Sequence, residues 1–182
     1  MSTKTLNFKV PTLEEVSEKN KGILTAIKNQ VGFVPNIYAT YAYSENALER
    51  YTTFANGKTT FNNKEKEVIN LVVSQVNGCE YCQAAHTAIG KMNGFTDEQV
   101  ISLRKGEAPF NEKFDALVKT AKAITLKKGR IEDEVLEIFF DAGYTKENLV
   151  DLIVAIGEKT TTNLLHNVTG IEIDFPKAVE LS

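Results

Sequence analysis

The sequence predicts an all-α fold, and three observations carry this prediction. Apolar residues recur at helical spacing in most segments, as in Phe114, Leu117, Val118 and Ala121, which is the pattern of one face of an amphipathic helix. Several of these segments follow a Ser, Thr or Asn and end at Asn or Gly, the residues that begin and end helices. No segment alternates apolar and polar residues convincingly, as a half-buried strand would.

The expected helices follow from the apolar spacing and from the capping residues. Thr12, Ser44 and Asn63 are predicted N-caps, and Thr96 with Gln99 forms a predicted capping box. The helices are expected at residues 12–30, 37–43, 44–56, 64–77, 79–93, 96–105, 111–128 and 131–142, and from 145 onward. The side chains expected to face inward near the two ends of the chain are Leu48, Tyr51, Phe54, Leu149, Leu152, Ile153, Ile156, Leu164 and Leu165.

Length and composition indicate one globular domain over residues 1–182, with a core over roughly 12–170. The net charge of −3 and the pI of about 5.5 argue against a nucleic-acid-binding protein, which would carry a basic stripe. The N-terminal residues lack the apolar stretch of a signal peptide, and no segment is long and apolar enough to span a membrane. We therefore expect a cytoplasmic protein, in which a structural disulfide would be unusual.

The two cysteines, Cys79 and Cys82, are separated by two residues. They follow an apolar segment that is longer than most strands and ends at Asn77 and Gly78, so a helix is predicted to stop there and a second helix to begin at the cysteines. The N-terminus of a helix carries partial positive charge and free N–H groups. This position favours thiolate over thiol.

A short connection between two helices usually makes them pack antiparallel. Glu67 lies about three turns before the connection and His86 just over two turns after it, so the two side chains are expected side by side. Cys79, Cys82 and His86 share one face of the second helix through their i, i+3, i+7 spacing. These residues, the motif over 67–86, predict a redox dithiol with its own acid–base pair.

Simpler explanations exist for each of these residues. The cysteines could be two small buried thiols, and His86 or Glu67 could be an ordinary buried or surface side chain. The cysteines and His86 could also bind zinc, with Glu67 or His166 as the fourth ligand. Attachment of c-type haem is excluded because Gln83, and not histidine, follows the second cysteine.

The pattern Glu67-x11-Cys79-x-x-Cys82-x-x-x-His86 resembles the signature of the AhpD-like alkylhydroperoxidases in the carboxymuconolactone decarboxylase superfamily. The segments 32–36, 163–167 and 171–176 also resemble the peroxidase-related branch, so the resemblance covers most of the chain. It implies an AhpD-like helical bundle. The best-studied members have a second histidine directly before the second cysteine, where this chain has Tyr81.

The resemblance implies an antioxidant thiol peroxidase that reduces alkyl hydroperoxides. Cys82 would attack the peroxide, Cys79 would resolve the sulfenic acid to a disulfide, and Glu67 with His86 would transfer protons; helix physics alone favours Cys79 as the attacking residue. No metal or organic cofactor is implied, but an external lipoyl-type or thioredoxin-like thiol must reduce the disulfide. The resemblance also implies a homo-oligomer. A carboxymuconolactone-decarboxylase-like enzyme and a non-catalytic metal-binding or redox-sensing module are the alternatives.

Overall fold

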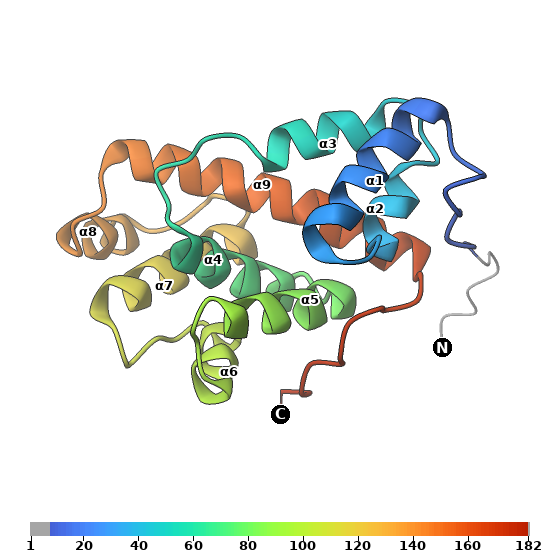
Figure 1. The fold of residues 1–182 in the computed structure, drawn as a ribbon. Helices are drawn as coiled ribbons and strands as arrows, with labels where there is room; N and C mark the ends of the chain where they lie inside the picture. Colours follow the sequence, from blue (N-terminus) through green and yellow to red (C-terminus); the bar gives the residue numbers. More distant parts are fainter. Residues whose placement is uncertain (1–7, 182) are drawn as a thin grey trace. The chain divides into compact units, whose positions relative to one another are not determined.

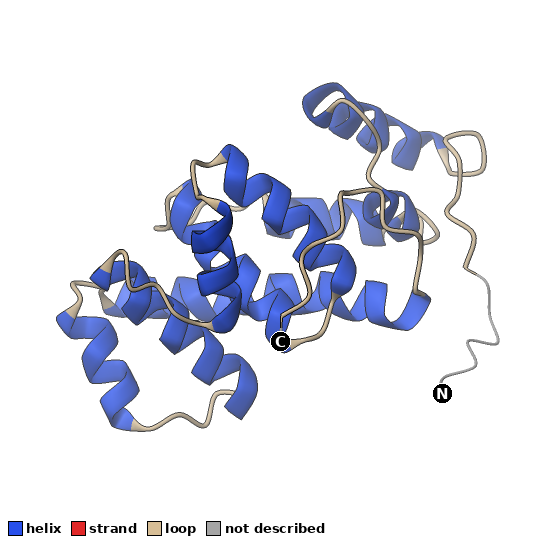
Figure 2. Ribbon diagram, turned by 90° about the horizontal axis from the view of Figure 1, so that it is seen from below, coloured by secondary structure: helices blue, strands red, loops and turns tan. Residues whose placement is uncertain are grey.

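The computed structural model describes residues 8–181, which form nine α-helices and contain no β-strand (Figures 1 and 2). The predicted all-α fold is therefore confirmed. The helices are α1 (Glu18–Val31), α2 (Asn36–Tyr41), α3 (Ala47–Ala55), α4 (Asn63–Val76), α5 (Glu80–Met92), α6 (Asp97–Lys105), α7 (Glu112–Lys127), α8 (Asp133–Asp141) and α9 (Lys146–Thr169).

The chain divides into two compact units. One comprises the residues up to Gly57 together with Leu165–Asp174, and the other comprises Lys58–Leu164 and the residues from Phe175 onward. The first unit thus contains α1, α2, α3 and the end of α9, and the second contains α4 to α8 and most of α9. The single domain expected over residues 1–182 stays a prediction.

In the first unit, one buried amide connects α1 to the segment between α2 and α3. The Asn20 side chain donates to the carbonyl oxygens of Ala42 and Ser44 at 3.2 and 3.1 Å. The rings of Tyr41 and Tyr51 stack at 4.4 Å between centroids and join α2 to α3. These contacts close a small aromatic core.

The second unit is built around α4, which contacts α5, α6 and α7 (Figure 1). Five apolar side chains in its middle have no exposed surface, and Asn70 is the polar residue among them. A helix that is apolar over most of its circumference must be surrounded by other elements. These five residues, Val68, Ile69, Leu71, Val72 and Val73, form the centre of the core that α6, α7, α8 and α9 complete.

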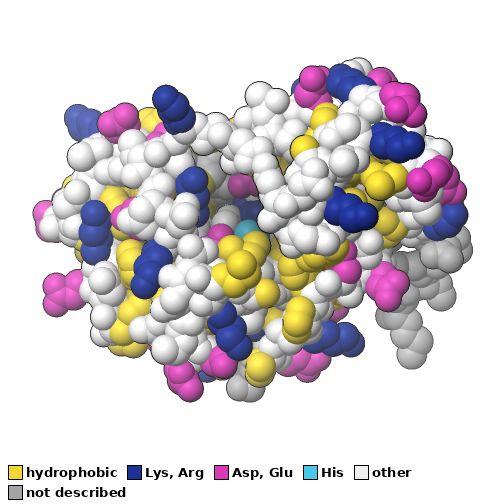
Figure 3. Space-filling view, in the orientation of Figure 1, with side chains coloured by type: hydrophobic (Ala, Val, Ile, Leu, Met, Phe, Trp, Pro, Cys, Tyr) yellow, Lys and Arg dark blue, Asp and Glu magenta, His cyan; other side chains and the backbone are white. Residues whose placement is uncertain are grey.

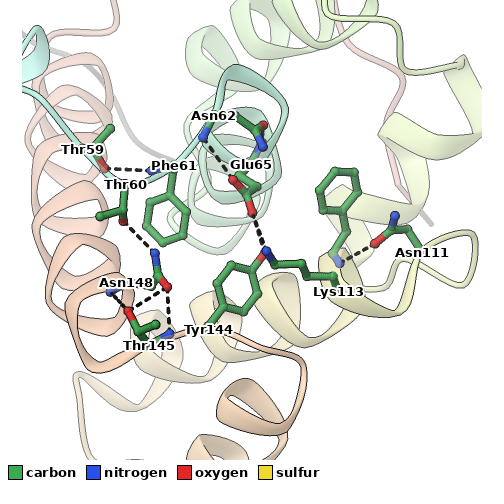
Figure 4. A network of polar contacts seen from close by, with 11 residues as sticks. Thr59, Thr60, Phe61, Asn62, Glu65, Asn111, Lys113, Tyr144, Thr145 and Asn148 are labelled. Carbon is green, nitrogen blue, oxygen red and sulfur yellow. Dashed lines mark hydrogen bonds and ion pairs between the residues drawn. The ribbon is translucent and has the colours of Figure 1, made fainter.

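The N-terminus of α4 is fixed by a polar network (Figure 4). Asn62 is the N-cap and forms a capping box with Glu65, so the predicted cap at Asn63 is wrong by one residue. The second oxygen of Glu65 accepts from the Tyr144 hydroxyl at 3.0 Å and lies 3.7 Å from the Lys113 ammonium. Glu65 is therefore buried, although it lies between Lys64 and Lys66 in a charged segment of the sequence.

The first helix begins six residues later than predicted. Thr12 and Glu15 form an isolated turn, in which the Thr12 N–H donates to the Glu15 carboxylate and the Glu15 N–H to the Thr12 carbonyl. This pattern imitates a capping box without a helix behind it. The N-cap of α1 is Ser17, which accepts from the Asn20 N–H.

Three side chains expected in the core are exposed, namely Phe54, Ile153 and Leu164. Leu48, Tyr51, Leu152 and Ile156 are buried as predicted. Ser44 accepts from the Ala47 N–H, but Asn46 is the N-cap of α3. Helical spacing alone does not determine how wide the buried face of a helix is. The predicted buried faces of α3 and α9 were therefore too wide and included positions at their edges that are exposed.

On the face shown in Figure 3, charged side chains of both signs are spread out, with apolar side chains exposed between them. None of the helices formed by residues 8–181 combines the length and the apolar character needed to cross a bilayer.

Candidate active site

The connection between α4 and α5 places the cysteines. Asn77 ends α4, and Gly78 follows with φ +65°, a left-handed conformation that glycine adopts without strain. The Cys79 N–H donates to the Ser74 carbonyl oxygen at 3.0 Å, which closes the turn. Cys79 is the N-cap of α5, as the sequence suggested.

The two thiols are free and buried, with 0% of Cys79 and 2% of Cys82 exposed. The Cys82 N–H donates to the Cys79 sulfur at 3.2 Å. A hydrogen bond from Cys79 is the largest influence on the Cys82 thiol and lowers its pKa to about 6. Burial opposes this shift, while the Lys159 ammonium, His86 and the Asn163 amide reinforce it.

The same contacts act in the opposite direction on Cys79. Its hydrogen bond to Cys82, its burial and the negative charge of the Cys82 thiolate raise the pKa of the Cys79 thiol well above its ordinary value. At neutral pH the pair therefore holds one thiolate, at Cys82, and one thiol, at Cys79. This order reverses the expectation from helix position alone and agrees with the order that the family resemblance implies.

His86 and Glu67 lie together on facing sides of α5 and α4. His86 Nδ1 is 2.8 Å from Glu67 Oε2, and the Asn70 amide donates to Glu67 Oε1 at 3.0 Å. Burial acts to raise the pKa of the Glu67 carboxyl, but His86, Asn70 and Lys159 together hold it below its ordinary value. The ionised carboxylate can only accept, so Nδ1 of His86 carries the hydrogen and Nε2 is the nitrogen left to exchange protons.

Two residues of α9, Lys159 and Asn163, belong to the site and were missed in the sequence. Both are buried, with 5% and 0% of their surface exposed. Just before α4, the Thr60 N–H donates to Asp151 Oδ2 at 2.6 Å. At the end of α4, the Asn77 amide donates to Asn163 Oδ1 at 2.9 Å. Over this stretch α9 therefore runs parallel to α4.

This parallel arrangement determines where Lys159 acts. Lys159 is one turn before Asn163, and helical side chains lean toward the N-terminus. It therefore lies alongside the part of α4 that precedes Ser74, where its charge acts on both Glu67 and Cys82. Neither residue had a clear sequence signal, because both lie in a polar stretch of α9, residues 158–163, where apolar spacing marks no inward face.

We expect Lys159→Met to raise the pKa of Cys82 toward that of an ordinary thiol, because the substitution removes a buried positive charge near the sulfur. The measurement is the thiolate absorbance at 240 nm during a pH titration, with a midpoint near pH 6 for the wild type. Lys159→Arg retains the charge and should keep a low midpoint. Equal midpoints in the wild type and Lys159→Met would show that the ammonium does not act on the thiol.

Tyr81, between the cysteines, is almost fully buried and packs edge-on against Phe175 at 5.7 Å between ring centroids. The segment after Phe175 is held by Arg104, which donates to the Val179 carbonyl at 2.7 Å and to Gln83 at 3.1 Å. Tyr81 thus packs beneath the C-terminal segment. The sequence had given it no role.

The structure brings together the four residues that the sequence predicted for the site, Glu67, Cys79, Cys82 and His86, all within the second unit. His166, which the zinc alternative invoked, belongs to the first unit. Over residues 8–181, no three His, Cys, Asp or Glu side chains form a group that could hold a metal ion. The catalytic roles of the four residues stay a prediction.

The fold and this site define a class of protein, an all-helical bundle with a buried dithiol and a Glu–His pair. Two solved structures share the fold. A peroxidase-related protein from Ralstonia eutropha JMP134, described as an alkylhydroperoxidase AhpD core, superposes with a TM-score of 0.83 at 19% identity over 92% of both chains. A peroxidase-related protein from Silicibacter sp. TM1040 gives 0.81 at 22% identity, over 93% of this chain and 92% of the other.

Sequence comparison points to the same group of proteins. YdfG, an uncharacterized protein of Bacillus subtilis (strain 168), is 28% identical over 126 residues, which are 68% of this chain and 82% of YdfG. Residues 44–125, which include the dithiol, match the model of the carboxymuconolactone decarboxylase family. Over these residues the chain is similar to the carboxymuconolactone decarboxylase family, and it shares its fold with the two peroxidase-related structures.

Proposed function

We propose that the protein is a thiol peroxidase that reduces organic hydroperoxides through Cys82 and Cys79. The observation that carries this proposal is the division of the dithiol into a low-pKa thiol at Cys82 and a high-pKa thiol at Cys79. A thiolate is the reactive form of cysteine, and a neighbouring thiol is what a sulfenic acid needs to form a disulfide. The Glu67–His86 pair supplies the proton chemistry.

In the first step the Cys82 thiolate attacks the terminal oxygen of the hydroperoxide. A sulfur–oxygen bond forms, the O–O bond breaks, and the alkoxide leaves with the electron pair. His86 lies one helical turn from Cys82; its Nε2 takes up the proton that the Cys82 thiol releases and passes it to the alkoxide, so that an alcohol is released. Glu67 holds the imidazole by Nδ1 and stabilises its protonated form.

In the second step Cys79 attacks the sulfenic sulfur of Cys82. The sulfur–sulfur bond forms, the S–O bond breaks, and hydroxide leaves as water with the proton of the Cys79 thiol. Two electrons from an external dithiol, of the lipoyl or thioredoxin type, then restore both thiols. The balanced reaction converts one hydroperoxide and two thiols to one alcohol, one water and one disulfide.

The superfamily is named for a decarboxylase, and this activity is the rival enzyme function. Decarboxylation or lactone hydrolysis does not require a pair of neighbouring thiols with one low and one high pKa. The dithiol therefore favours redox chemistry over decarboxylation.

Assembly into a homo-oligomer is also part of the proposal. The side chains of Val150, Val154 and Leu164 are exposed along α9, and they recur at helical spacing on one face of that helix. Exposed apolar side chains on one face of a helix are a common feature of protein interfaces. Sedimentation velocity on the purified protein should show a species larger than one chain of 20.2 kDa.

A single-turnover reaction tests the proposed activity. The fully reduced protein is mixed with one equivalent of cumene hydroperoxide and no reductant. We expect one equivalent of 2-phenyl-2-propanol, loss of both thiols, and a Cys79–Cys82 disulfide that dihydrolipoamide reduces. Protein alkylated with iodoacetamide is the control and should form no alcohol. Unchanged thiols and unconsumed hydroperoxide in the unmodified protein would refute a peroxidase function.

A further inference from the structure

A hollow of about 560 Å³ lies in the second unit between α7, α8 and α9. This volume is in the range of small-molecule binding sites, which are mostly apolar with a few polar groups. Six aliphatic side chains form its walls: Ile124, Ile131, Leu136, Leu149, Ile153 and Ile156. Asn77 and Thr160 give it a polar end.

Hydrogen bonds connect the polar end of the hollow to the turn that carries the two cysteines. The Asn77 amide donates to Thr160 Oγ1 at 3.3 Å and to Asn163 Oδ1 at 2.9 Å. The Asn163 amide in turn donates to Ser74 Oγ at 3.3 Å, and the Ser74 carbonyl oxygen accepts from the Cys79 N–H at 3.0 Å. A chain of hydrogen bonds therefore leads from the hollow to the turn that carries the cysteines.

A glycine in the wall of the hollow, Gly157, also supports a binding role. It is a glycine inside α9 that lines the hollow, and no atom lies within 4 Å of the position that a β-carbon would occupy. Its φ is not positive, so the backbone does not require glycine. Glycine within a helix costs about 1 kcal/mol relative to alanine. The missing side chain destabilises α9, and it keeps the hollow open.

We propose that the hollow binds the apolar body of the hydroperoxide, with the O–O group at the Asn77–Thr160 end and directed past Asn163 to Cys82. The inference rests on the proposed peroxidase function and adds a selectivity to it. Aryl and branched alkyl hydroperoxides gain contacts with the aliphatic walls, whereas hydrogen peroxide reaches the thiolate without them. Gly157 is then a specificity-determining residue.

The test compares Gly157→Leu with Gly22→Leu. Gly22 is also inside a helix, also has no atom within 4 Å of a β-carbon, and lies in α1, outside the hollow. We expect Gly157→Leu to lower kcat/KM for cumene hydroperoxide by at least about tenfold and to leave that for hydrogen peroxide unchanged. Gly22→Leu should change neither value, and thermal unfolding should show that both variants are folded.

Three results would overturn the inference. Equal losses for both peroxides would mean that the substitution damages the thiols, and no loss would mean that the hollow is not used. A smaller species of Gly157→Leu in sedimentation velocity would mean that a second copy of the chain fills the hollow. Binding of the product, 2-phenyl-2-propanol, is measured by calorimetry independently of turnover. If the wild type reduced no peroxide, the proposed peroxidase function would be refuted. Loss of alcohol binding in Gly157→Leu would still show that the hollow is a binding site.

Discussion

Cys82→Ser should abolish the reduction of hydroperoxides, with a loss of at least about a thousandfold, because the substitution removes the thiolate that attacks the O–O bond. Cys79→Ser should still react once, since its Cys82 keeps access to peroxide but has no partner for a disulfide. Rapid quenching with detection of the alcohol measures both reactions. The sulfenic acid left in Cys79→Ser should be trapped by dimedone as an adduct on Cys82.

The two variants are matched controls for each other, since each retains one thiol in the same buried turn. The reverse result, one turnover in Cys82→Ser and none in Cys79→Ser, would assign the attack to Cys79. It would mean that proximity to the helix N-terminus outweighs the hydrogen bond that lowers the pKa of Cys82. Loss of the Cys79 donor should also weaken the Cys82 thiolate, so the single turnover of Cys79→Ser should need a higher pH.

Much of the fold could be predicted because its helices begin and end at local signals. Thr96 with Gln99 was recognised as a capping box from the sequence and caps α6. The next helix was expected to begin at Asn111, which is the N-cap of α7. The prediction failed where the same signal occurs without a helix behind it. The Glu15 carboxylate accepts from the Thr12 N–H, as in a capping box, but the Glu15 N–H donates to the Thr12 carbonyl oxygen, and the chain continues as a turn until Ser17.

The contact between Glu67 and His86 could be predicted because only one short connection separates their helices. Counting residues from Gly78 along an antiparallel pair is sufficient to pair them. Lys159 and Asn163 could not be placed in this way, because their helix lies about 80 residues further along the chain. Their register is set by contacts such as Asn77 with Asn163, which carry no local sequence signal.

The burial of Glu65 and Glu67 shows a related limit. Both carboxylates lie in a charged segment at the start of α4, and spacing alone does not separate them from Lys64 or Lys66. Glu65 is buried because a cap and the Tyr144 hydroxyl satisfy it, and Glu67 because His86 and Asn70 do. Each partner has to be known before either burial can be predicted.

Glu67→Gln should lower the rate of peroxide reduction by about a hundredfold, the usual contribution of a positioned proton donor. The amide retains the size of the side chain, but it has no charge to stabilise protonated His86. Glu65→Gln is the matched control, since it changes a second buried carboxylate two residues earlier on α4. Because glutamine also completes a capping box, this variant should stay folded and active.

The pH dependence separates the role of Glu67 from that of Lys159. Cys82 must lose its proton to react, so the wild-type rate should rise as the pH passes upward through about 6 and then level off. The Glu67 carboxylate contacts His86, so we expect Glu67→Gln to act mainly on the plateau and to move the midpoint less than Lys159→Met does. Lys159→Met should move the midpoint to higher pH. A midpoint shift in Glu67→Gln as large as that in Lys159→Met would mean that the carboxylate acts on the thiol and not on the proton donor.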